Sequence, residues 1–251
     1  MFSDFIFDVE GTLIDSVSQN LRSLQDALER HGYRVPYQTL QLYSGLDGDQ
    51  TLQLVAPDAT EPERKEILKE QGAIYERSYL DSVRPFERVR SVFSDLTARG
   101  GKIALATDCK GLAFKRYLSL LDANEFIAGT ACGDDVDHGK PDPRLVGHAL
   151  AKLRVPAFKA VMIGDTPYDA EAGLEAGTKA AGVITGGFST EALLQAGCFA
   201  VAVDVQALLF SLQSGEVVEQ SQATMGKLIK FPSRRMVARE QPPRDPNSGS
   251  L

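Results

Sequence analysis

Two carboxylates stand two residues apart near the start of this chain, Asp8 and Glu10 of the segment Asp8-Val9-Glu10-Gly11-Thr12-Leu13. The apolar run Phe5-Ile6-Phe7 precedes them and predicts a strand, so both side chains can face one site at its carboxyl end. An aspartate on a rigid strand end is a suitable covalent nucleophile toward phosphorus. A second carboxyl group beside it can protonate the leaving oxygen and later deprotonate water. The segment therefore indicates phosphoryl-transfer chemistry, and its alternative interpretation is an ordinary acidic turn.

Two further clusters carry groups that can hold a phosphate. Thr107 and Asp108 follow the apolar run that ends at Ala106, where a hydroxyl and backbone N–H groups can bind phosphate oxygens. Lys140 lies between turn-forming residues in Gly139-Lys140-Pro141-Asp142-Pro143, and an ammonium there can act as a point charge on the phosphate. We therefore predict Thr107, Asp108 and Lys140 as phosphate-binding residues.

A fourth cluster supplies two more acids. Asp165 and Asp169 follow the run Val161-Met162-Ile163, again at the end of an expected strand. Together with Asp8 they form a set of hard oxygen ligands, which suits Mg²⁺, whereas Zn²⁺ prefers His or Cys. Four polar clusters that converge on one sheet edge are hard to obtain by chance, so we expect a single magnesium-dependent site.

These clusters need a sheet that brings strand ends together, and the apolar runs predict one. Short apolar runs alternate with segments of helical period, as in βαβ units. The expected strands are Phe5 to Asp8, Lys102 to Ala106, Ile127 to Ala131, Ala160 to Ile163, Ala180 to Ile184 and Phe199 to Val203. Parallel strands that helices cover on both faces should be continuously apolar, and most of these runs are. The expected fold class is α/β, with a doubly wound (Rossmann-like) parallel sheet.

The segment from about Val17 to Ser82 breaks this alternation, because it has several helical stretches and no convincing strand. We expect a helical cap inserted after the first strand. The expected division is 1–16 and 83–212 for the core, 17–82 for the cap and 213–251 for a C-terminal tail. An insertion at this point lies beside the carboxyl ends of the strands, where open α/β sheets bind ligands, so it can serve as a lid.

The tail is rich in Gln, Ser, Pro and Arg, and we expect it to be partly disordered. Its basic residues are Lys227, Lys230, Arg234, Arg235, Arg239 and Arg244. Such charges are typical of a solvated tail, and the alternative is a docking segment for an acidic partner.

The composition limits the possible partners. The chain has 251 residues, enough for one large α/β domain with a smaller insertion. Its net charge of −7 means that it has no excess of positive charge to attract a nucleic acid. No apolar run approaches the ~20 residues of a spanning helix, and no apolar leader precedes the first expected strand. We therefore expect a cytoplasmic protein with no nucleic-acid or membrane partner, either a monomer or a homodimer.

Taken together, the four clusters resemble the motifs of the haloacid dehalogenase-like hydrolase superfamily, in particular of its members with a helical cap after the first motif. The resemblance covers about residues 3 to 212. The segments GKPDP, GDTPYDAEAG and TGGFSTEALLQAG are most similar to phosphoglycolate-phosphatase-like members. Thr107 and Lys140 match the positions that hold phosphate in this family.

The resemblance also implies roles for the acidic residues. Asp8 is expected to be the nucleophile and to carry an aspartyl phosphate, and Glu10 is expected to be the acid/base. A Mg²⁺ ion is expected to be held by Asp8, the main-chain carbonyl of Glu10 and Asp165. Asp169 matches a supporting acid near the metal.

Two positions depart from the family pattern. The family usually has Asp where this chain has Glu10, although enolase-phosphatases share the DxEGT form. Glu10 also differs from the aromatic residue typical of true dehalogenases and from the small residue typical of phosphonoacetaldehyde hydrolases. Asp108 stands where Asn or Ser is common. Its charge should repel a phosphate unless it turns away or pairs with a cation such as Lys110.

The loop from Tyr43 to Gln50 in the expected cap is the predicted specificity segment, with Gly45, Leu46 and Asp47 at its centre. It contains no Arg or Lys, which argues against a second phosphate on the substrate. It also argues against a sugar-phosphate mutase, because the mutases that this chain resembles usually carry an Arg there.

The predicted function is a Mg²⁺-dependent phosphomonoesterase that acts on a small phosphorylated metabolite. Two alternatives stay open. One is a phosphomutase, which returns the phosphoryl group from Asp8 to a substrate hydroxyl instead of to water. The other is a non-catalytic binding protein, in which Glu10 and Asp108 mark a decayed site.

Overall fold

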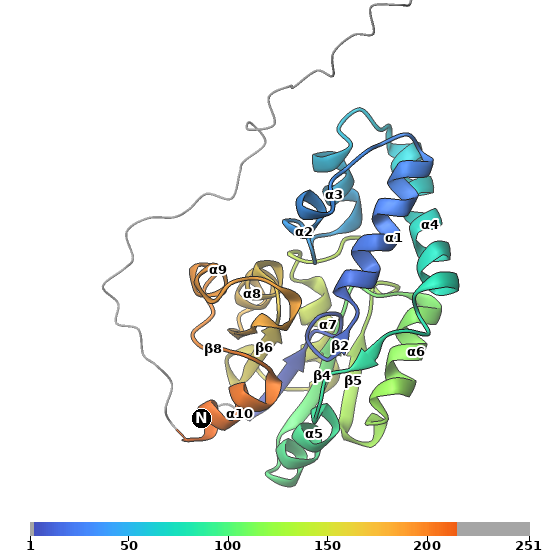
Figure 1. Ribbon diagram of the computed structural model, residues 1–251. Coiled ribbons are helices and arrows are strands. Elements are labelled where there is room, and N and C mark those ends of the chain that lie inside the picture. Colours follow the sequence, from blue (N-terminus) through green and yellow to red (C-terminus); the bar gives the residue numbers. More distant parts are fainter. Residues whose placement is uncertain (1–2, 215–251) are drawn as a thin grey trace, which may run out of the picture. The chain divides into compact units, whose positions relative to one another are not determined.

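The computed structural model describes residues 3–214, which form an α/β arrangement around one large sheet (Figure 1). Within this range the strands of the sheet are β1 Asp4–Phe7, β4 Lys102–Ala106, β5 Ile127–Ala131, β6 Ala160–Gly164, β7 Lys179–Val183 and β8 Val201–Ala202. They lie in the order β5-β4-β1-β6-β7-β8, and each neighbouring pair is parallel. The expected parallel sheet is confirmed, and β4 and β5 have the bounds that the sequence predicts.

Helices cover both faces of this sheet. One face carries α5 Val89–Ala98, α6 Gly111–Leu121 and α10 Val205–Ser214, and the other carries α7 Arg144–Leu153, α8 Pro167–Glu175 and α9 Thr190–Gln195. Side chains of a strand alternate between faces, so Phe5 and Phe7 of β1 pack with the first group while Ile6 packs with the second. Burial on both faces explains why the strands are continuously apolar, and it confirms the doubly wound class.

The order of the strands reverses between β1 and β6. From β1 the chain continues to β4 and β5 on one side, and it then crosses to β6 on the other side of β1. At such a reversal the connections leave in opposite directions and open a crevice at the carboxyl ends of the strands. Asp8 follows β1 and Asp165 follows β6, so both acids lie at this switch point.

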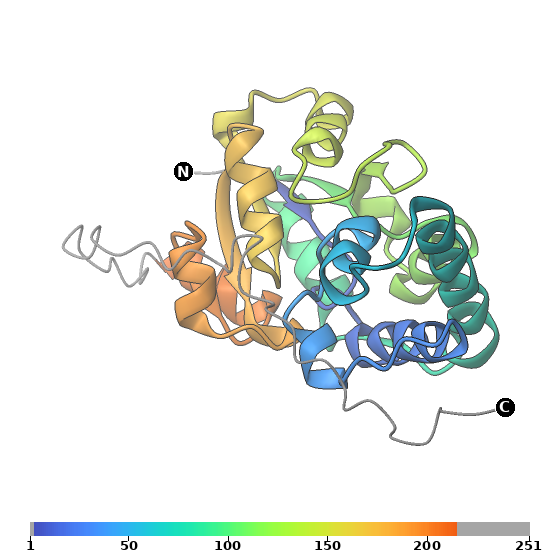
Figure 2. The same ribbon diagram turned by 90° about the horizontal axis from the view of Figure 1, so that it is seen from above.

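The segment after β1 contains α1 Val17–Arg30, α2 Tyr37–Gln41, α3 Gly48–Val55 and α4 Glu61–Ser78. Helices α1 and α4 pack along each other (Figures 1 and 2). Their facing apolar side chains, among them Leu24, Leu28 and Ile67, form a hydrophobic cluster apart from those of the sheet. Thr60 caps the start of α4, because its hydroxyl accepts the N–H of Glu63.

A short antiparallel ribbon joins the two ends of this helical segment. It pairs β2 Ile14–Asp15, which leads into α1, with β3 Arg84–Pro85, which follows α4. The sequence pattern predicts no strand at either place. Strands of two residues show no alternation of apolar and polar side chains, so the pattern gives no signal for them.

Helix α10 extends to Ser214, and the expected division into core, cap and tail stays a prediction. The remainder of the expected tail, with its basic residues, lies outside the described residues. Within residues 3–214, no helix combines the length and the apolar composition needed to cross a bilayer.

The packing of α5 on the sheet gives a stability prediction. Phe93 is completely buried, and its ring lies 5.1 Å from that of Phe7. Phe93→Ala should lower the free energy of unfolding by about 3–5 kcal/mol, because it removes buried aromatic surface and leaves a cavity. Urea denaturation measures this loss, and Phe158→Ala is the control because Phe158 is 70% exposed. A loss for Phe93→Ala as small as that of the control would contradict the packing described.

Candidate active site

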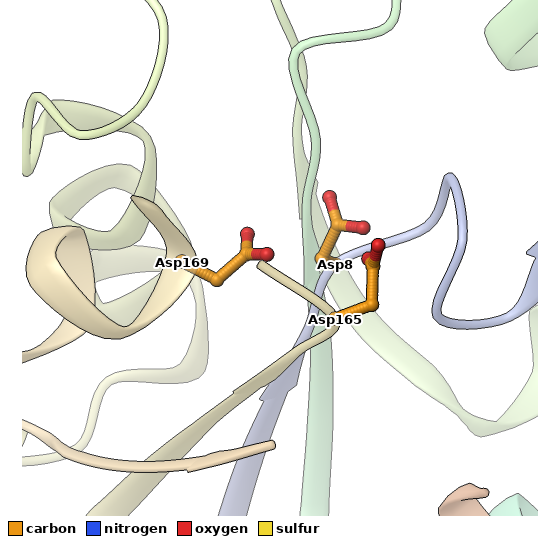
Figure 3. Close-up of side chains that lie close together, drawn as sticks. All are labelled: Asp8, Asp165 and Asp169. Carbon is orange, nitrogen blue, oxygen red and sulfur yellow. The ribbon is translucent and has the colours of Figure 1, made fainter. Parts of the chain in front are cut away.

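Three buried carboxylates, those of Asp8, Asp165 and Asp169, meet at the switch point of the sheet (Figure 3). Asp8 extends β1, and its N–H donates to the carbonyl of Ile163 at 2.9 Å. Asp165 follows β6, and Asp169 comes from the first turn of α8. One oxygen of each carboxylate lies within 4.8 Å of those of the other two. The structure thus brings together three acids that the sequence separates widely.

The ammonium of Lys140 lies between two of these carboxylates. Its Nζ donates to Asp8 Oδ1 at 2.5 Å, to Asp169 Oδ1 at 2.6 Å and to the carbonyl of Ala106 at 3.4 Å. Burial lowers the pKa of this ammonium, but the carboxylates of Asp169, Asp8 and Asp108 together raise it well above its ordinary value. Lys140 is therefore charged at neutral pH, and it ties its own turn to the strand ends.

Asp169 is fixed by the helix that carries it. Thr166 Oγ1 accepts the N–H of Asp169 at 3.2 Å, and Asp169 Oδ2 accepts the hydroxyl and the N–H of Thr166 at 2.7 and 3.1 Å. This capping box leaves Oδ1 for Lys140, so both carboxylate oxygens are engaged. Thr166 is not among the residues predicted from the sequence, although a threonine before Pro167 and three residues before an acid is a recognisable helix start.

Asp165 has a different environment. Its Oδ1 accepts the hydroxyl of Thr12 at 2.8 Å, whereas its Oδ2 is buried and has no hydrogen-bond donor within residues 3–214. Gly11, at φ +82°, and Gly186 leave this oxygen room, since a Cβ at either position would collide with it. A buried carboxylate oxygen without a donor is costly, so this environment is suited to an ion.

The electrostatics of the site also fit a divalent cation. Burial raises the pKa of Asp8 to about 7, although Lys140 opposes the rise. Burial likewise raises the pKa of Asp165 well above its ordinary value, and the charges of Asp8 and Asp169 add to this effect. A cation with a preference for oxygen ligands would favour the ionised form of each acid. The acidic cluster can therefore bind a metal ion, and its oxygen-only donor set fits the expected Mg²⁺.

The carboxylate of Glu10 is bound by two side chains that the sequence analysis did not single out. Tyr117 Oη donates to Glu10 Oε1 at 2.9 Å, and Asn20 Nδ2 donates to the same oxygen at 3.2 Å. Burial raises the pKa of Glu10, and these two donors lower it. Tyr117 comes from α6 and Asn20 from α1, so no local motif could have indicated either residue.

Thr107 is fully buried at the end of β4. Its N–H donates to the carbonyl of Ala131 at 3.1 Å, which continues the pairing with β5. Its Oγ1 accepts the N–H of Cys109 at 3.2 Å. The sheet therefore takes the backbone donor of Thr107, and the hydroxyl remains as the group that can bind a phosphate oxygen.

Asp108 pairs with Lys140 rather than with Lys110. Its Oδ1 accepts the N–H of Lys140 at 3.1 Å, and its Oδ2 lies 3.6 Å from Lys140 Nζ. The suggested pairing with Lys110 is thus corrected, because the turn at residues 139–143 brings a nearer cation to the end of β4. Burial raises the pKa of Asp108 to about 6, and Lys140 opposes the rise.

The acids line a cavity of about 1020 Å³ between the strand ends and the helical segment. The predicted specificity residues Gly45, Leu46 and Asp47 also line it. The N–H of Asp47 donates to the carbonyl of Lys140 at 3.1 Å, and its Oδ2 accepts the N–H of Gly139 at 3.0 Å. Asp47 therefore holds the Lys140 turn against the helical segment, which is a structural use that the sequence analysis did not expect.

The family model of haloacid dehalogenase-like hydrolases matches residues 5–183. The chain belongs to this family. The pyrophosphatase PpaX of Anoxybacillus flavithermus is 29% identical over 185 residues, which cover 71% of this chain and 81% of that protein. The phosphoglycolate phosphatase of Aquifex aeolicus is 28% identical over 177 residues, which cover 70% of this chain and 82% of that protein. The family and the hydrolase class predicted from the motifs are confirmed.

Solved structures agree with the fold. A hydrolase from Pseudomonas syringae has a TM-score of 0.79 and 26% identity, covering 84% of this chain and 98% of that chain. A β-phosphoglucomutase from Clostridium difficile has a TM-score of 0.74 and 18% identity, covering 86% of this chain and 97% of that chain. The second likeness concerns the fold alone.

The acidic cluster of this haloacid dehalogenase-like hydrolase predicts stabilisation by Mg²⁺. Binding to the folded state alone should add about 2.7 kcal/mol at a hundredfold excess over Kd, and a chelator should remove this gain. Thermal melting measures both conditions. Asp165→Asn should lose most of the Mg²⁺-dependent shift, whereas Asp95→Asn, an exposed acid on α5, should keep it. Identical wild-type melting temperatures in Mg²⁺ and chelator would rule out this metal assignment.

Proposed function

We propose that this hydrolase is a phosphomonoesterase that transfers the phosphoryl group of a small metabolite first to Asp8 and then to water. The observation that carries the proposal is the position of Asp8. Its carboxylate lies at the switch point, beside the charged Lys140 and the unpartnered oxygen of Asp165. The names of the relatives, pyrophosphatase and phosphoglycolate phosphatase, support phosphate hydrolysis as the reaction.

In the first step an oxygen of Asp8 attacks phosphorus. The bond between phosphorus and the leaving oxygen breaks, and the leaving oxygen keeps the electron pair and takes a proton from the carboxyl group of Glu10. The charge of Lys140, whose Nζ donates to Asp8, Asp169 and the carbonyl of Ala106, attracts the phosphate oxygens, and the hydroxyl of Thr107 binds one of them. Asp47 fixes the turn that carries Lys140. This step leaves an aspartyl phosphate and a free alcohol.

In the second step water attacks the phosphorus of the aspartyl phosphate. The carboxylate of Glu10 takes a proton from the water, and the bond to Asp8 breaks, which returns Asp8 as a carboxylate and releases inorganic phosphate. Asp8, Asp165 and the main-chain carbonyl of Glu10 would hold Mg²⁺, with Asp169 in support. When bound, this ion supplies positive charge that offsets the carboxylates and the transferred phosphoryl group.

We also propose that residues 17–82 act as a cap over this site. Their helices have a hydrophobic cluster of their own, and the ribbon β2–β3 joins their two ends to the sheet domain. Leu21, Leu24 and Leu68 of α1 and α4 line the cavity that also contains Asp8. A cap that closes on the site would exclude water while Asp8 reacts, and its apolar wall would contact the leaving group.

The charges of the cavity favour a substrate with a single phosphate. Two basic side chains of α4 reach the cavity, but Arg64 pairs with Asp49 and Lys65 pairs with Glu61, both at 2.6 Å. Lys110 also lines the cavity, but the lining has more acidic than basic side chains, which disfavours a second phosphate. A screen should compare phosphoglycolate, pyrophosphate, sugar phosphates and p-nitrophenyl phosphate, each with and without Mg²⁺. Release of inorganic phosphate identifies a hydrolase, and isomerisation of a sugar phosphate identifies a mutase. Binding of a phosphate ester without turnover of any compound would favour the binding protein.

Asp8→Asn should abolish turnover, because an amide is neither an adequate nucleophile nor a good anionic metal ligand. The fold should survive, which circular dichroism can check. Trapping of the wild type with beryllium fluoride should depend on Mg²⁺ and should fail in the variant. Retention of more than a few per cent of kcat in purified Asp8→Asn would exclude covalent catalysis by Asp8.

Glu10→Gln separates proton transfer from metal binding. Mg²⁺ affinity should stay nearly unchanged, because the residue would hold the metal through its main-chain carbonyl. Turnover of an alkyl phosphate should fall by ~10²–10⁴-fold, since its leaving oxygen needs a proton. With p-nitrophenyl phosphate, whose leaving group needs little acid assistance, a burst of p-nitrophenol followed by a slow steady state is expected. Wild-type turnover of alkyl phosphates by the variant would disprove the acid/base role.

A further inference from the structure

Two chains of hydrogen bonds converge on one oxygen of Glu10. In the first, Tyr117 Oη donates to Glu10 Oε1 at 2.9 Å, and Tyr117 Oη is itself hydrogen-bonded to Tyr75 Oη. A tyrosine hydroxyl has one proton, and that of Tyr117 is given to Glu10, so Tyr75 must be the donor of the second bond. The direction of this chain is therefore fixed, from Tyr75 through Tyr117 to the carboxylate.

The second chain runs through two amides. Gln71 Nε2 donates to Asn20 Oδ1 at 2.8 Å, and Asn20 Nδ2 donates to Glu10 Oε1 at 3.2 Å. Gln71 thereby fixes which end of the Asn20 amide faces Glu10. Both chains thus end on Oε1, and no side chain within residues 3–214 donates to Oε2.

These contacts come from both parts of the chain that surround the cavity. Glu10 follows β1 and Tyr117 lies on α6, whereas Asn20 lies on α1 and Gln71 and Tyr75 lie on α4. Glu10, Asn20, Gln71 and Tyr75 all line the cavity, and Tyr117 is completely buried behind Glu10. The hydrogen bonds therefore cross from the helical segment to the strand end.

The length of the Glu10 side chain matters for these contacts. A glutamate carries its carboxylate one methylene farther from the backbone than an aspartate at the same position. This reach brings Oε1 to the hydroxyl of Tyr117 and the amide of Asn20. A flexible side chain held through one oxygen has fewer orientations, and the other oxygen then points in a defined direction.

We propose that Tyr117 and Asn20 are positioning residues, which hold Oε1 of Glu10 and leave Oε2 to exchange protons with the leaving group and with water. Tyr75 and Gln71 orient these two donors. The helical segment thereby completes the proton-transfer group when it is packed on the sheet. This proposal rests on the acid/base role of Glu10 in the proposed function.

Tyr117→Phe tests the proposal because it removes only the hydroxyl. The kcat for an alkyl phosphate should fall by about ten- to hundredfold, as expected when a reacting group loses its orientation. KM should change little, since Lys140 and Thr107 are untouched. Tyr75→Phe should give a smaller loss of the same kind. Tyr79→Phe is the matched control, because its hydroxyl donates to Asp26 at 3.1 Å instead, and it should keep the wild-type kcat.

A double-mutant cycle distinguishes positioning from general damage. In a Glu10→Gln background, Tyr117→Phe should cause no further loss of kcat, because there is no proton donor left to orient. A structural defect would instead lower kcat by the same factor in both backgrounds. If Tyr117→Phe fails to fold, Asn20→Ala supplies the same cycle, since alanine suits helix α1.

The outcomes separate this proposal from the one on which it rests. A kcat that depends on Glu10 but not on Tyr117 or Asn20 overturns the positioning role alone. If Glu10→Gln keeps the wild-type kcat, the acid/base assignment is overturned, and the positioning role with it. Both roles are supported if Tyr117→Phe lowers kcat and leaves KM unchanged. The same substitution must then cause no further loss of kcat in the Glu10→Gln background.

Discussion

The concentration of buried negative charge around Asp8 is the constraint on which the rest of the site depends. Three carboxylates within 4.8 Å of one another repel, and burial makes the repulsion stronger than it would be in water. Lys140 offsets one of these charges through its contacts with Asp8 and Asp169. The unpartnered oxygen of Asp165 marks where a further positive charge is needed. Asp8 is thereby held in a fixed position beside a place where a cation could bind.

The fold produces this arrangement through common structural features, namely the strand order, a helix cap and a hydrogen-bonded turn. The reversal of strand order between β1 and β6 brings Asp8 and Asp165 together, because parallel strands end at the same edge of the sheet. The capping box of α8 fixes Asp169, and Asp47 fixes the turn that carries Lys140. The helix cap and the Asp47 contact give hydrogen-bond partners to backbone and side-chain polar groups that would otherwise be buried without them. Local stability and the geometry of the site therefore come from the same hydrogen bonds.

The helical segment contributes contacts to the candidate site as well as walls to the cavity. Its residues reach the site at two separate places, at Asp47 beside Lys140 and at Asn20 beside Glu10. The first contact holds the group that is proposed to bind phosphate, and the second holds the group that is proposed to transfer protons. Glu10 makes its contacts with Tyr117 and Asn20 through a side chain that is one methylene longer than that of an aspartate.

The sequence by itself determined the parallel sheet, the order of its strands along the chain and the four motifs at their ends. Continuous apolar runs, turn-forming residues and paired acids are local signals, and residues such as Asp8, Lys140 and Asp165 could be found from them. Only the tertiary structure decided the order of the strands in space, the ribbon β2–β3, the pairing of Asp108 with Lys140 and the contacts of Glu10. Tyr117 lies 107 positions from Glu10 in the chain, and Thr12 lies 153 positions from Asp165. Such contacts follow from the packing of whole helices and strands, and no periodicity or spacing within one segment predicts them.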